Sequence, residues 1–169
     1  MNIDKFKITN KGTTEIDIKQ LHITIKNYIQ VNTDNIVYPD NLKYLWNISN
    51  GLNLIGCPYN TYGLNIFSVE HISEYKNTVA IFGDIENMNS WYEASNDKMD
   101  SISYYSDSSL WVCIGCFNEY DFIFIQVNTL NINYGRIKII TNNCCLERFI
   151  DIKTDIINDL YNEYLNNYS

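Results

Sequence analysis

The amino-acid sequence predicts one α+β domain: a mixed, mostly antiparallel β-sheet of about six strands, flanked by N-terminal helices and a C-terminal helix. Apolar residues recur at helical spacing near both ends of the chain, whereas its middle holds short apolar segments of strand length. The hydrophobic content of 46% is sufficient for one core, and no linker or internal repeat divides residues 1–169. We therefore expect a single domain.

Two helices are expected in the N-terminal part. Thr14 and Asp17 fit a capping box, and the apolar residues that follow lie at helical spacing, although several of them also alternate as in a strand. The second helix is expected to have Pro39 at its first position, where no N–H is needed, and Asn50-Gly51 as a left-handed stop. The face that it is expected to bury comprises Leu42, Leu45, Trp46 and Ser49.

The middle of the chain predicts short strands and one hairpin. Strands are expected at Leu52–Gly56, Tyr62–Phe67 and Val79–Phe82, with a short helix at Val69–Tyr75. Leu110–Phe117 and Asp121–Val127 are expected to pair as a hairpin. The second of these strands is apolar on both faces, which is typical of a central strand covered on both sides.

The C-terminal part predicts one further strand and a long helix. Tyr134–Ile140 alternates, with Ile137 and Ile139 expected inward and Arg136 and Lys138 outward. From about Cys145 onward the pattern is helical. The expected apolar stripe of that helix comprises Phe149, Ile152, Ile156, Ile157, Leu160, Tyr161 and Tyr164.

The net charge of −8 is concentrated in one segment. Residues 70–121 hold ten acidic and two basic residues, and the rest of the chain holds ten of each. Nucleic acids and anionic membranes both select basic surfaces, so we expect neither as a partner. Two interpretations remain: a solvated acidic surface, or a docking face for a basic protein.

Residues 85–106 are polar and acidic, and we interpret them as an insertion. Trp91 lies there among acidic residues, as an aromatic interface anchor with a charged rim would, although it could equally fill the insertion locally. We predict that binding to a protein partner involves Glu86, Trp91, Glu93, Asp97, Asp100, Asp107, Glu119 and Asp121.

Nothing in the sequence favours an enzyme. It contains no phosphate-binding loop, dinucleotide fingerprint or nucleophile elbow, so no catalytic residue and no cofactor is predicted. Cys113 and Cys116 have zinc-site or redox spacing, but positions three apart on a strand face opposite sides unless Gly115 forms a tight turn. Cys144 and Cys145 are adjacent and poor co-ligands. We interpret these cysteines as small buried hydrophobes and predict no metal, with a zinc-binding domain as the weaker alternative.

The start of the chain lacks the apolar region of a secretory signal. The longest apolar stretch, residues 111–117, is far shorter than the roughly 20 residues that span a bilayer. We therefore expect a cytoplasmic protein.

Several segments are similar to one known family. Residues 38–51, Tyr-Pro-Asp-Asn-Leu-Lys-Tyr-Leu-Trp-Asn-Ile-Ser-Asn-Gly, resemble the signature of the SUKH superfamily, in which a Pro-Asp/Glu step opens a helix that ends in Asn-Gly. Residues 62–67, 111–125 and 134–137 resemble later segments of that family. The likeness spans about residues 14–165. It departs in residues 85–106 and in the hairpin, where Glu119-Tyr120-Asp121 stands in place of a frequent Gly-Gly-Asp turn.

The resemblance implies a mixed sheet flanked by helices, without a catalytic site. It also implies an immunity-type protein that binds and neutralises a toxin domain, often a basic nuclease, and an acidic surface agrees with such a partner. Other members of the family are regulatory adaptors, and this remains the alternative function.

Overall fold

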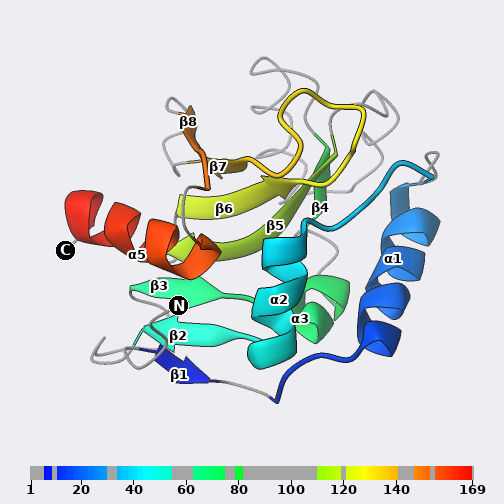
Figure 1. The fold of residues 1–169 in the computed structure, drawn as a ribbon, viewed down its shortest axis with the longest axis horizontal. Helices are drawn as coiled ribbons and strands as arrows, with labels where there is room; N and C mark the ends of the chain where they lie inside the picture. The colour runs from blue at the N-terminus through cyan, green and yellow to red at the C-terminus, as the bar shows by residue number, and fades with distance from the viewer. Residues whose placement is uncertain are drawn as a thin grey trace, which may run out of the picture.

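The computed structural model describes residues 6–8, 11–29, 34–54, 63–74, 79–81, 110–118, 121–140, 147–152 and 155–168. Its elements (Figure 1) are β1 (Phe6–Ile8), α1 (Glu15–Ile29), α2 (Asp40–Ile48), β2 (Leu52–Leu54), β3 (Leu64–Ile66), α3 (Val69–Glu74), β4 (Val79–Ile81), β5 (Leu110–Phe117), β6 (Asp121–Gln126), β7 (Ile137–Ile140), β8 (Glu147–Ile150) and α5 (Ile156–Asn167). The predicted α+β class is confirmed. None of the described helices is both long and apolar enough to cross a membrane.

The described strands form one sheet of eight, against about six predicted, in the order β1-β2-β3-β5-β6-β7-β8 with β4 also paired to β5. Every pairing among them is antiparallel. On one edge of β5, β4 pairs with its first half and β3 with its second half, while β6 pairs along the other edge. The hairpin predicted from β5 and β6 is confirmed.

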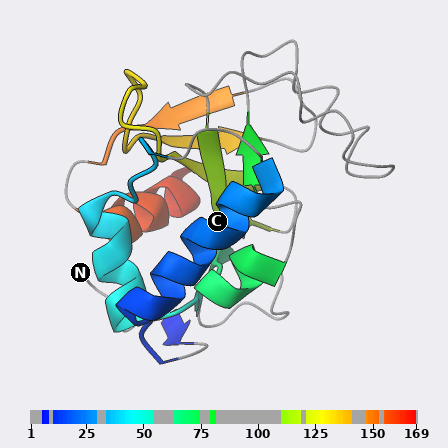
Figure 2. The same ribbon diagram turned by 90° about the vertical axis from the view of Figure 1, so that its right-hand side faces the viewer.

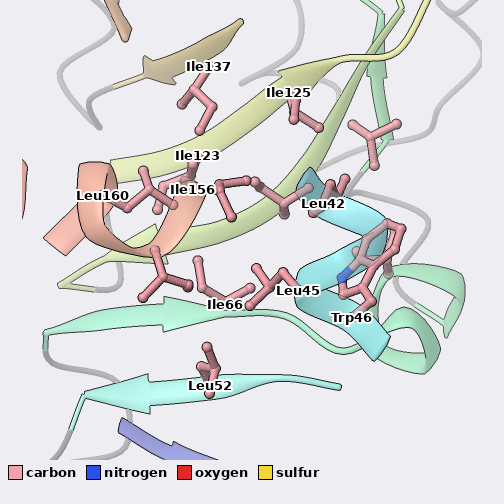
Figure 3. Packing of buried hydrophobic residues seen from close by; sticks show 14 of the residues in the cluster. Leu42, Leu45, Trp46, Leu52, Ile66, Ile123, Ile125, Ile137, Ile156 and Leu160 are labelled. Atoms are coloured by element: carbon pink, nitrogen blue, oxygen red, sulfur yellow. The ribbon is translucent and has the colours of Figure 1, made fainter. Parts of the chain in front are cut away.

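The described helices all contribute to one core on one face of the sheet (Figure 2). Figure 3 shows side chains of α2 and α5 meeting those of β3 and β6 in this layer. Ile123, Ile125 and Val127 face this core, whereas Phe124 belongs to a second cluster on the opposite face. The prediction of a central strand that is apolar on both faces is therefore confirmed for β6.

The start of α1 has the predicted capping box. The Thr14 N–H donates to Asp17 Oδ2 over 2.9 Å, and the Asp17 N–H donates to Thr14 Oγ1 over 3.3 Å. These hydrogen bonds hold the pKa of Asp17 below its usual value. Leu21 is buried while Ile16 and Ile23 are exposed, so the segment follows helical rather than strand periodicity.

The bounds of α2 differ slightly from those predicted. Pro39 is the N-cap rather than the first helical residue, and Ser49 leaves the helix in an extended conformation. Gly51 has φ +100°, so the left-handed turn leads into β2 instead of stopping the helix. Asn50 serves a tertiary contact, because its Oδ1 accepts a hydrogen bond from the N–H of Val69 at the start of α3.

Two predictions for the C-terminal part are wrong. The segment predicted as helix from Cys145, which itself lies outside the described residues, contains β8, and α5 begins only at Ile156 with Asp155 as its N-cap. Pairing with the edge of β7 outweighs the helical spacing of the apolar residues. Lys138 is on the face opposite to Ile137, as its alternation requires, but it is only 5% exposed. Its Nζ lies 4.6 Å from the ring centre of Trp111 and 5.2 Å from that of Phe149.

Replacement of Trp46 tests the core beneath α2. This side chain is fully buried and packs edge-on against Tyr38 with ring centres 5.5 Å apart. We expect Trp46→Ala to lower the free energy of unfolding by about 3–5 kcal/mol, measured by urea denaturation. Tyr44→Ala, in the same helix but at a 59% exposed position, should change it by less than about 0.5 kcal/mol. A loss below about 1 kcal/mol for Trp46→Ala would contradict this packing.

Candidate functional site

Of the eight predicted partner-binding residues, only Asp121 lies in the described part of the structure. Glu86, Trp91, Glu93, Asp97, Asp100, Asp107 and Glu119 lie outside it. Asp121 begins β6 and is half-buried, and its Oδ2 accepts a hydrogen bond from the Tyr168 hydroxyl over 2.6 Å. The structure thus places the one visible member of the predicted interface against the end of α5.

Tyr168 is the centre of a polar network that fastens α5 to the sheet. Its hydroxyl oxygen accepts a hydrogen bond from Arg148 Nη2 over 2.6 Å, and Arg148 Nη1 pairs with Glu163 over 2.9 Å. The Tyr168 ring stacks on Phe117 with centres 4.6 Å apart. Burial, together with the hydrogen bond to Asp121, raises the pKa of Tyr168. Asp121 therefore has a structural role inside the domain.

The Cys113–Cys116 pair is arranged differently from a regular strand. Cys113 is opposite Phe124 and Cys116 is opposite Phe122, because a β-bulge before Gly115 shifts the register by one residue. Both thiols therefore face the side of the sheet away from the helices. Gly115 is required there, since a β-carbon at this position would collide with the carbonyl oxygen of Asn65.

Both of these thiols are buried, and burial raises the pKa of Cys113. Within the described ranges no three His, Cys, Asp or Glu side chains are placed to hold a metal ion together. Cys144 and Cys145, the other two members of the weaker zinc alternative, lie outside those ranges.

The connection between β6 and β7, residues 128–136, is a loop with a dense network of hydrogen bonds. Asn128 Oδ1 accepts from the Leu130 N–H over 2.9 Å, and Asn131 Oδ1 accepts from the Asn133 N–H over 2.8 Å. Arg136 Nη1 donates to Asn133 Oδ1 over 2.9 Å. Backbone hydrogen bonds close successive turns at 128–131, 131–134 and 133–136. Asparagine side chains therefore fix the course of this loop.

A second segment, leading into α2, holds the base of the loop. The Thr129 N–H donates to the Asn35 carbonyl over 2.9 Å, and the Val37 N–H donates to the Val127 carbonyl over 2.8 Å. An isolated bridge pairs Ile36 with Asn128. The loop and this segment lie side by side in both ribbon views (Figures 1 and 2).

This rigid loop carries apolar side chains that face solvent. Ile132 is 97% exposed and Leu130 is 72% exposed. Val37, Tyr44 and Tyr134 are also exposed and lie on the same two segments or the adjoining turn of α2. Partial burial raises the pKa of Tyr134, on which the nearby charges of Lys43 and Asp40 also act. We refer to Val37, Tyr44, Leu130, Ile132 and Tyr134 as the loop surface.

Scattered exposed apolar residues are ordinary, but a group of five on adjoining rigid segments is typical of an interaction site. Neither Leu130 nor Ile132 was among the predicted binding residues. Their signal in the sequence is Asn-Thr-Leu-Asn-Ile-Asn, residues 128–133, in which isolated apolar residues alternate with turn-forming asparagines.

The charges around the loop surface are mainly acidic. Asp34, Asp40 and Asp151 are exposed beside it, while Lys43 pairs with Asp40 over 2.7 Å and Arg136 pairs with Asp151 over 2.6 Å. Ile81 and Leu110 pair at this same end of the sheet, because the next residue, Trp111, pairs with Gln126 just before the loop. The sequence between them, residues 82–109, contains six acidic residues and one lysine.

A comparison of the chain with models of known protein families gives no match, and a comparison with curated proteins gives none either.

Removal of the Tyr168 hydroxyl tests the network around Asp121. We expect Tyr168→Phe to lower the free energy of unfolding by about 1.5 kcal/mol, because it removes hydrogen bonds to a carboxylate and a guanidinium. Urea denaturation at neutral pH measures this loss. Tyr44→Phe, at an exposed position, serves as the matched control and should be neutral. Equal stability of the two variants would show that the network contributes nothing.

The same pair of proteins tests the pKa of Tyr168. Because this pKa is raised above its ordinary value of 10.0 in the folded protein, the unfolded chain loses the phenolic proton first. Stability from this group is therefore fully present below pH 10 and is lost as the pH rises further. We expect the stability difference between wild type and Tyr168→Phe to shrink from about pH 9 to about pH 11. A constant difference would contradict the raised pKa.

Proposed function

We propose that this protein is a non-enzymatic binding domain of the immunity type, which binds a basic, nuclease-like toxin domain and neutralises it. The observation that carries this proposal is the loop surface, an apolar group held rigid and exposed at the end of the sheet where the acidic stretch 82–109 leaves and returns. Apolar anchors surrounded by charge are typical of protein–protein interfaces.

Two further features support the proposal. The segment that resembles the SUKH signature forms α2 and the turn after it, and its Asn50 caps α3, so these residues have defined structural roles. The excess of acidic residues in 70–121 would complement a nuclease, whose substrate groove must be cationic to bind nucleic acid. We also place the action of the protein in the cytoplasm, where a nuclease meets its substrate.

Capture followed by a toxicity assay tests the proposed function. The tagged chain is incubated with lysate of its own organism at low salt and at about 0.5 M salt, and bound proteins are identified by mass spectrometry. We expect one stoichiometric basic partner that arrests growth when expressed alone and loses its toxicity when this chain is co-expressed. Its association rate should fall several-fold as the salt concentration rises.

Several substoichiometric partners would instead favour the regulatory-adaptor alternative. A stoichiometric partner that is harmless when expressed alone would contradict the immunity role, as would an association rate that does not depend on salt.

A further inference from the structure

The geometry of the 128–136 loop points to a specific anchor: we propose that Ile132 and Leu130 insert into an apolar recess on the partner, and that the rim of this recess is basic. This inference rests on the proposed function and names the residues that determine how long the partner stays bound.

Ile132 and Leu130 do not stabilise the domain itself. Ile132 is almost fully exposed, and neither residue belongs to the two buried clusters formed by the described residues. By contrast, Ile137, just beyond the loop, is fully buried in the main core. A large β-branched side chain held in water gains no burial energy from folding, so its contribution is expected in a complex.

The loop is organised before any partner arrives. Fixing the backbone of one residue costs about 1–2 kcal/mol, and this cost weakens binding by a loop that orders only on contact. Here the asparagine-capped turns and the hydrogen bonds to Asn35 and Arg136 already fix the backbone. Burial of Leu130 and Ile132 is therefore available to the complex with little ordering cost, as in the small central set of residues that dominates most interfaces.

The surrounding charges select the partner. Asp34, Asp40 and Asp151 border the loop, and Lys43 and Arg136 are each engaged by one of these carboxylates. A second copy of this chain would bring acidic surfaces together in two molecules of charge −8. An anionic membrane would be repelled by the same carboxylates. A basic protein with an apolar recess satisfies both the loop and its rim.

Site-specific photo-crosslinking tests the anchor. A photoreactive p-benzoylphenylalanine replaces Ile132 in the full chain, and in a control it replaces Ile16, which is 75% exposed in the first turn of α1. After irradiation in lysate of the source organism, we expect a discrete adduct with one basic protein from position 132 and none from position 16. An adduct between two copies of this chain, or no discrete adduct from position 132, would overturn the inference.

Binding kinetics then separate the anchor from the charges. Ile132→Ser and Leu130→Ser should each weaken the affinity for the crosslinked protein at least about tenfold, through faster dissociation and with an unchanged salt dependence of association. Ile16→Ser should bind as wild type does, and unchanged urea midpoints of all three variants would exclude misfolding.

The two proposals fail in different ways. If wild type captures a toxin and Ile132→Ser binds it equally well, the anchor is wrong and the proposed function stands. If the protein crosslinked at position 132 is not toxic, the proposed function is wrong and the anchor stands.

Discussion

The architecture depends on the contact between Gly115 and the carbonyl group of Asn65. Only a residue without a side chain allows β3 to approach β5 this closely, and the bulge at the same place turns Ile114 towards the helices and both neighbouring thiols away from them. Because β3, β4 and β6 all pair with β5, this one position sets the register of strands on both of its edges. The helices then cover the face on which that register places the aliphatic residues.

The strand β6 links two different kinds of polar structure. At its first residue, Asp121, buried aromatic stacking and charge-assisted hydrogen bonds fix the C-terminal helix. After its last residue, asparagine side chains fix a loop that faces water. Six residues of strand span about 20 Å, so the two regions are well separated. A strand that is buried on both faces is the most rigid support available for such a loop, because its side chains cannot move without disturbing two apolar clusters.

The sequence allowed much of the fold to be predicted and little of the candidate site. The strands β5 and β6 could be located because their apolar residues occupy both faces, a pattern that no amphipathic helix shares. The segment containing Phe149 was assigned to a helix because its spacing also fits one, and only the free edge of β7 decides for a strand. The exposure of Leu130 and Ile132 could not be predicted, because apolar residues are normally assigned to the core. Their exposure follows from three-dimensional hydrogen bonding to asparagines and to residues 35–37.

The antiparallel pairing of Ile81 with Leu110 has a consequence for how this kind of domain can diversify. Two strands paired in this way need only a turn of a few residues to join them, yet here residues 82–109 intervene. The entropy of closing a longer connection rises by only about 0.6 kcal/mol for each doubling of its length. Insertions, deletions and charge changes between β4 and β5 therefore cost the sheet very little. Related chains could exchange one binding specificity for another by changing this stretch alone, while the loop at the same end of the sheet retains its backbone.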